Sequence, residues 1–151
     1  DICSISKNFT QERVTMLLIA HHLKEVLSQI ITQCNAMGIS CLVEIQKLED
    51  LKYIGSLTED DFMIGFNNRD IDTLETKDNP IAFTKDFMAG LRKRYQGIVV
   101  SESGHQTLRD IRTSIKVGAD AVLVGTALMK AKNPRKTLAK FVNAFKKGAK
   151  C

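Results

Sequence analysis

The chain has 151 residues, of which 44% are hydrophobic, and its formal net charge at pH 7 is +5. This composition excludes a disordered chain, and the length suits one domain. No apolar run approaches the roughly 18 residues that cross a bilayer, and the first residues lack the basic and apolar segments of a signal peptide, so we expect a soluble, cytoplasmic protein with no membrane partner.

Five short apolar segments predict the strands of a parallel sheet. Each is nearly continuous rather than alternating in polarity, which is typical of strands buried on both faces. They span residues 14–20, 39–45, 61–67, 97–103 and 120–125.

Helices are predicted between and after these strands. Apolar residues at spacings of three and four occur in residues 23–31, 48–54, 108–115 and 138–145. Gly38 and Gly118 follow two of these segments, as glycines at helix C-termini do. Strands that alternate with helices indicate an α/β protein built from βα units. An open doubly wound sheet would usually carry a GxGxxG loop, which this chain lacks, whereas a segment of a (β/α)8 TIM barrel also fits.

The cysteines and histidines give no metal-binding pattern. Cys34 and Cys41 flank the predicted turn between the first helix and the second strand, and we expect them to be small core residues. The chain has no CxxC pair and no Cys/His pair at zinc spacing. His21 and His22 are adjacent, so on a helix their side chains diverge by about 100°. We therefore expect no metal site.

Positive charge gathers in residues 91–95 and 130–150. Runs of this kind usually form solvated helix faces. Nucleic-acid binding favours aromatic residues among the basic ones, but the chain has no Trp, and Phe141 and Phe145 have the helical spacing of core residues. We therefore expect no nucleic-acid partner. An alternative use of the charge is attraction of a phosphorylated small-molecule substrate.

Polar side chains end the second and third predicted strands. Glu44 lies at the end of a buried strand, where a carboxylate is costly unless it is paired or used, and it suits a general acid or base. A salt-bridged structural glutamate is the alternative. The next strand ends in Asn67, Asn68, Arg69 and Asp70. A turn with a helix cap explains the Asn and Asp residues but explains Arg69 poorly.

The fourth and fifth predicted strands end in glycines and hydroxyls. Ser103 is predicted to cap the helix after the fourth strand, and Gly104 permits close backbone approach to a ligand. Gly125 and Thr126 open another helix in the same way. Backbone amides at helix starts bind phosphate, so the two neighbouring strand ends together predict a phosphate site.

Together these motifs closely resemble the indole-3-glycerol phosphate synthases, (β/α)8-barrel enzymes of tryptophan biosynthesis. The resemblance runs from about residue 14 to about residue 133 and is carried, in order, by LLIA, MGISCLVEI, IGFNNRDIDTLE, VVSESG and GADAVLVGTALMKAKNP. These segments look like strands four to eight of that barrel. The resemblance implies a carboxy-lyase that needs no cofactor. It would close the ring of 1-(2-carboxyphenylamino)-1-deoxyribulose 5-phosphate and release carbon dioxide and water, giving indole-3-glycerol phosphate.

The resemblance also implies roles for individual residues. Glu44 would be the general base of the later steps, and Asn67 would bind and orient the substrate. Arg69 would lie near the anthranilate end of the substrate, Leu74 would pack on its aromatic ring, and Glu102 would meet its hydroxyls. The phosphate group would be held by Ser103, Gly104, Gly125 and Thr126.

Two strand units of the family, which carry two of its lysines, have no match in the 151 residues. One of these lysines is the general acid for ring closure, and Lys7 lies in no comparable motif. We therefore expect one partial TIM-barrel domain over residues 1–151, inactive until missing N-terminal strands or a partner chain close the barrel. His105 stands where the family usually has an aliphatic residue.

Two other functions stay open at this point. One is a different phosphate-binding TIM-barrel enzyme, such as a relative of phosphoribosyl anthranilate isomerase, whose usual Cys and Asp have no match here. The other is a non-catalytic half-barrel that binds phosphate or pairs with another chain.

Overall fold

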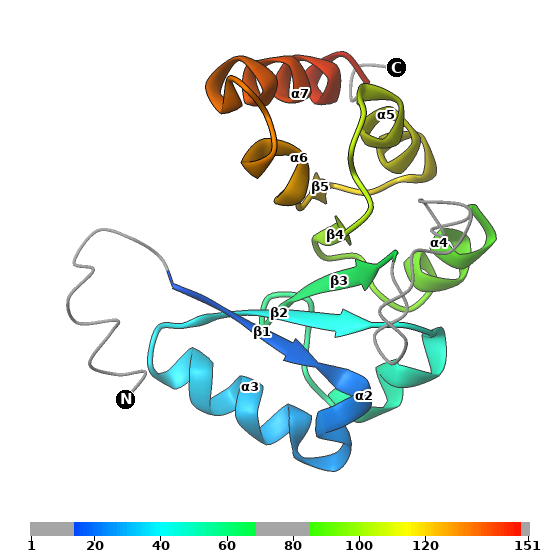
Figure 1. Cartoon of the computed structure of the whole chain (residues 1–151). Coiled ribbons are helices and arrows are strands. Elements are labelled where there is room, and N and C mark those ends of the chain that lie inside the picture. The colour runs from blue at the N-terminus through cyan, green and yellow to red at the C-terminus, as the bar shows by residue number, and fades with distance from the viewer. Residues whose placement is uncertain (1–13, 69–84, 149–151) are drawn as a thin grey trace.

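The computed structural model describes residues 14–68 and 85–148. Within them, five parallel strands form one sheet in chain order (Figure 1). They are β1 (Thr15–Ile19), β2 (Ser40–Ile45), β3 (Met63–Asn67), β4 (Val99–Glu102) and β5 (Ala121–Val122). Each predicted strand is confirmed. A doubly wound sheet reverses its strand order, whereas a barrel does not, so the uninterrupted order identifies a partial TIM barrel.

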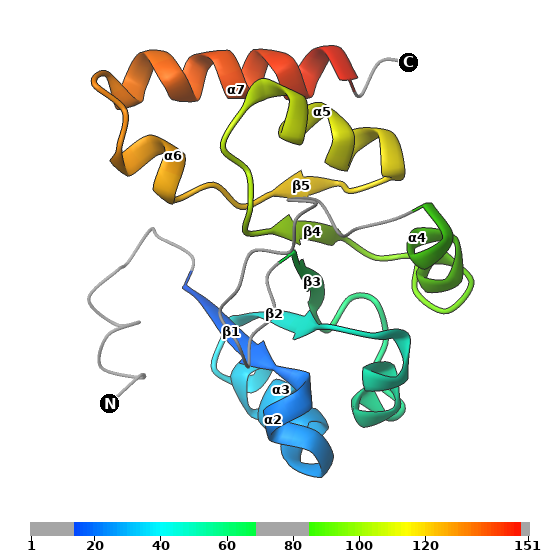
Figure 2. The same ribbon diagram turned by 45° about the vertical axis from the view of Figure 1, so that its right-hand side comes forward.

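Apart from the short α6, which follows the end of β5, the helices lie on the outer side of the curving sheet (Figures 1 and 2). They are α2 (Ala20–Leu23), the 3-10 helix η1 (Lys24–Val26), α3 (Leu27–Ala36), the 3-10 helix η2 (Leu48–Ile54), α4 (Lys85–Arg92), α5 (Leu108–Val117), α6 (Thr126–Met129) and α7 (Pro134–Gly148). The predicted end of α5 is confirmed, because Gly118 caps it with a left-handed φ of 107°. Every helix in the described ranges is too short or too polar to cross a membrane.

The main core lies between the sheet and the helices that follow β1, β2 and β3. Val43, Ile64 and Val99 point outward from three neighbouring strands and are fully buried. Cys34 of α3 and Cys41 of β2 are buried free thiols, which confirms them as core residues. A second cluster joins α5 to α7 through Ile111, Phe141 and Ala144.

The basic segment at residues 91–95 matches the predicted solvated helix face only in part, because Lys93 and Arg94 are exposed but lie beyond the end of the helix. Helix α4 ends at Arg92, and Leu91 and Tyr95 are buried. Arg92 is held by the Asp120 carboxylate (2.5 Å) and by the carbonyl of Gly97 (2.6 Å). The basic run therefore closes the turn between α4 and β4, because two of its residues are apolar enough to enter the core.

β1 and β5 are the outer strands of the described sheet. Leu17 on β1 and Leu123 just after β5 are about half exposed, at 48% and 52%. Pairing places Leu17 beside Leu42, on the face of the sheet that also carries Glu44. The concave face is therefore least covered at the two edges.

Candidate active site

Glu44, Asn67 and Glu102 lie on the concave face, at the carboxyl ends of three neighbouring strands. Parallel pairing aligns Asn67 with Glu102, and Glu44 with Gly65 two residues earlier on β3. Side chains two residues apart on a strand point to the same face, so the three polar side chains converge. Asn67 Nδ2 donates a hydrogen bond to Glu44 Oε1 at 3.0 Å.

Glu44 and Glu102 form a buried pair of carboxyl groups, with the residues only 3% and 2% exposed. Burial raises the pKa of Glu102 to about 7, helped by the negative charge of Glu44 and by a hydrogen bond to that side chain. Oε1 of Glu102 is buried and has no hydrogen-bond partner in the described part of the chain. With this pKa, Glu102 keeps its proton part of the time near neutral pH, so its carboxyl group can give or accept a proton there.

The four residues predicted to bind phosphate line one cavity of about 320 Å³ between β4 and α5 on one side and β5 and α6 on the other. Ser103 and Gly104 both have left-handed backbones, with φ of 62° and 75°. Gly125 is the N-cap residue of α6, so Gly125 and Thr126 open a helix as predicted. The structure thus brings the two strand ends together around one cavity.

Ser103 does not cap the next helix, contrary to the prediction. Helix α5 begins at Leu108, and its cap is Thr107, whose Oγ1 accepts from the amide of Asp110 at 3.3 Å. The Asp110 carboxylate in turn accepts from the amide of Thr107 at 2.8 Å. This reciprocal pair satisfies the first amides of α5, and the left-handed turn at Ser103 and Gly104 precedes it.

Asn68 is a buried residue whose role the sequence did not reveal. Its Nδ2 donates to Ser101 Oγ (3.1 Å) and to the carbonyls of Glu102 (2.7 Å) and Ser103 (3.1 Å). It therefore fixes the end of β3 against the backbone of Glu102 and Ser103, which leads from β4 to the cavity. The only sequence signal was a second Asn directly after Asn67, which also suits an ordinary turn.

Arg69 and Leu74 lie outside the described residues, so their predicted positions stay predictions. Among the described residues, no three His, Cys, Asp or Glu side chains gather as metal ligands would.

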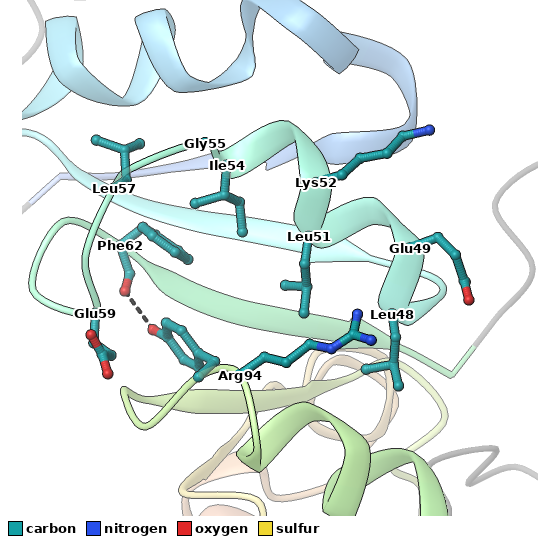
Figure 3. A pocket seen from close by; sticks show the side chains of 11 residues that line it. Leu48, Glu49, Leu51, Lys52, Ile54, Gly55, Leu57, Glu59, Phe62 and Arg94 are labelled. Carbon is teal, nitrogen blue, oxygen red and sulfur yellow. Dashed lines mark hydrogen bonds between the residues drawn. The ribbon is translucent and has the colours of Figure 1, made fainter.

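A second cavity of about 560 Å³ lies beside η2 (Figure 3). Leu51, Ile54 and Phe62 contribute to its apolar lining, and the Tyr95 hydroxyl donates to the carbonyl of Phe62 at 2.6 Å. Phe62 comes just before β3 and Tyr95 shortly before β4, so this cavity extends toward the amino ends of the strands. Barrel enzymes carry their chemistry at the carboxyl ends, where Glu44, Asn67 and Glu102 meet.

A family model described as indole-3-glycerol phosphate synthase matches residues 4–141. The chain belongs to this family. An indole-3-glycerol phosphate synthase of Pyrococcus furiosus is 40% identical over 129 residues, which are 85% of this chain and 54% of that protein. The chain therefore spans about half the length of this curated relative.

One further relative agrees with this assignment, and one solved structure agrees with the fold. The tryptophan biosynthesis protein TrpCD of Archaeoglobus fulgidus is 36% identical over 122 residues, which are 81% of this chain and 21% of that protein. Among solved structures, a chain of the Amycolatopsis orientalis BexX/CysO complex superposes with a TM-score of 0.56 at 20% identity, over 81% of this chain and 48% of that one. That likeness supports the fold alone.

Proposed function

We propose that this chain forms five βα units of an indole-3-glycerol phosphate synthase of tryptophan biosynthesis. The whole enzyme would close the ring of 1-(2-carboxyphenylamino)-1-deoxyribulose 5-phosphate, with loss of carbon dioxide and water. The observation that carries the proposal is the buried cluster of Glu44, Asn67 and Glu102, since it lies at the strand ends where barrel enzymes act.

Each member of the cluster has a chemistry that fits this reaction. Glu44 would be the general base of the later steps, and its hydrogen bond from Asn67 would orient the carboxylate. Asn67 would also orient the substrate. Glu102, whose pKa is about 7, keeps a proton part of the time near neutral pH, so it can donate a hydrogen bond to a substrate hydroxyl.

The 320 Å³ cavity would hold the substrate phosphate, because left-handed backbone at Ser103 and Gly104 and a helix start at Gly125 and Thr126 present amides to an anion. Arg69 and Leu74 would bind the anthranilate end of the substrate. The proposal needs no cofactor, and it includes a cytoplasmic location.

Missing N-terminal strands, or a partner chain, would complete the barrel and bring the remaining catalytic groups. The half-exposed Leu17 and Leu123 on the concave face support this, because a closed barrel would bury both side chains. The chain alone would then bind phosphate without turnover.

An assay of indole fluorescence tests the function. The 151-residue chain is fused to the part of the Pyrococcus furiosus relative that it does not cover, and substrate is added to the fusion and to the chain alone. We expect a fluorescent indole product from the fusion only. A fusion that folds and binds inorganic phosphate but makes no product would favour the non-catalytic half-barrel.

A further inference from the structure

His105 is a buried histidine with hydrogen bonds at both ring nitrogens. It is 4% exposed. Its Nδ1 lies 3.2 Å from the carbonyl oxygen of Leu123, and its Nε2 lies 2.8 Å from Ser114 Oγ. A carbonyl oxygen can only accept, so the Leu123 bond places a hydrogen on Nδ1. When the ring is neutral, Nε2 carries no hydrogen and accepts from the Ser114 hydroxyl.

The imidazole connects the two halves of the cavity described above. His105 directly follows Gly104 in the loop between β4 and α5, whereas Leu123 lies two residues before Gly125 in the connection between β5 and α6. Both His105 and Leu123 also line that cavity. The bond between them thus joins the backbone segments that carry the two glycines.

A chain of buried hydroxyls holds the other side of the ring. Ser114 Oγ of α5 lies 3.1 Å from Ser101 Oγ of β4, and Ser101 Oγ accepts from Asn68 Nδ2. Ser101 Oγ also lies 3.3 Å from Nε2 of His105. The orientation of the ring is therefore fixed from two elements at once, and it can serve as a rigid link.

Burial keeps this ring neutral. It lowers the pKa of His105 below the ordinary value, although the Leu123 carbonyl and the Asp110 carboxylate act in the opposite direction. A neutral ring adds no positive charge to the cavity, so its contribution to anion binding would come from geometry.

We propose that His105 is a positioning residue of the phosphate subsite, where its Nδ1–H bond to the Leu123 carbonyl sets the spacing between the Gly104 and Gly125 amides. This inference rests on the proposed function, because that function supplies the phosphate. The ligand class is a phosphomonoester dianion. Rigid placement of donors improves anion binding, since less ordering is needed when the ligand arrives.

The test is an NMR titration of the chain with inorganic phosphate, using the amides of Gly104 and Gly125 as reporters. His105→Leu fills the buried space with an apolar side chain but removes the Nδ1–H donor, and we expect phosphate affinity to fall about 3- to 10-fold. His105→Asn can place an amide N–H near the Nδ1 position, and we expect its affinity to stay within about 2-fold of wild type. Ser114→Ala leaves the bond between His105 and the Leu123 carbonyl in place, so its phosphate affinity should lie between those of His105→Leu and His105→Asn.

Nitrogen shifts of the His105 ring give a second readout that needs no variant, and we expect the Nδ1–H tautomer. The opposite tautomer, or equal phosphate affinity for wild type and His105→Leu, would overturn the proposal. The proposal would also be overturned if His105→Leu and His105→Asn lowered phosphate affinity equally, since that result would indicate a packing role for His105. If phosphate leaves both glycine amides of the wild type unshifted, the phosphate site itself is wrong and the proposed function fails with it.

Discussion

The carboxyl group of Glu102 occupies the space that a side chain at Gly65 would need. A Cβ built on residue 65 would overlap Oε1 of Glu102 and lie 2.8 Å from its Cδ. Gly65 pairs with Glu44 across β2 and β3. The absence of a side chain at this one position therefore lets the two carboxyl groups approach each other.

Gly65→Ala is predicted to displace Glu102 from the cluster. In the fused barrel, turnover should fall about 100-fold, because a shift of about 1 Å at a reacting group costs that much. In the chain alone, NMR titration should show the pKa of Glu102 moving from about 7 toward its ordinary 4.5 as the carboxyl reaches water. Gly90→Ala is the matched control, since a Cβ there would meet only the end of the Leu48 side chain.

The pH dependence of stability should reveal Glu102. Its pKa is raised from 4.5 to about 7 on folding, so its contribution is fully present below pH 4.5 and is lost as the pH rises through 7. The free energy of unfolding is measured by urea denaturation at each pH for wild type and for Glu102→Gln. The difference between the two proteins should isolate the pH dependence that Glu102 contributes. His105 contributes with the opposite sign, but it is present in both proteins and cancels in the difference. A difference that stays flat across this pH window would contradict the raised pKa.

Asn68→Ala is predicted to lower the free energy of unfolding by about 2 kcal/mol, because it removes the three hydrogen bonds that the buried Asn68 amide donates to Ser101, Glu102 and Ser103. Asn35→Ala is the control. The Asn35 amide donates to the Asp61 carbonyl at an exposed position, so water can replace the lost bond and the cost should stay below about 1 kcal/mol. Urea denaturation measures both, and equal losses would argue against a special role for Asn68.

Thr107→Ala should destabilise the chain by about 1 kcal/mol, as expected for loss of a helix cap. Ser103→Ala should change stability by less than about 0.5 kcal/mol, because Ser103 caps no helix. Thermal unfolding of the two variants checks the cap assignment. If Ser103→Ala were the less stable of the two variants, Ser103 rather than Thr107 would be the N-cap residue of α5.

The strands could be predicted from the sequence because each is a continuous apolar run, and parallel strands that are buried on both faces require such runs. Helix α4 was harder to find. Its apolar residues Phe87, Met88 and Leu91 form less than three turns and are interrupted by Gly90. The end of α5 was found because Gly118 adopts the left-handed conformation that favours glycine.

The candidate site was predictable in part for a similar reason. Glu44 and Glu102 stand out as carboxylates at the ends of buried strands. The network around His105 joins Ser114, nine residues away, to the Leu123 carbonyl, 18 residues away. Nothing in the local sequence indicates such bonds, since they depend on how α5 packs against β4 and β5. The cap of α5 was misplaced because a Ser-Gly pair and a Thr-x-x-Asp segment both suit a helix start.

Turnover by Glu44→Gln in the fused barrel tests the central claim most directly. The substitution keeps the size of the side chain and an oxygen that can accept from Asn67, but it removes the base. We predict that kcat falls by a factor of about 100 to 10,000 while KM changes little. Glu49→Gln, an exposed glutamate on η2, should keep wild-type kcat. Wild-type kcat in Glu44→Gln would contradict the assignment of Glu44 as general base and of this cluster as the active site.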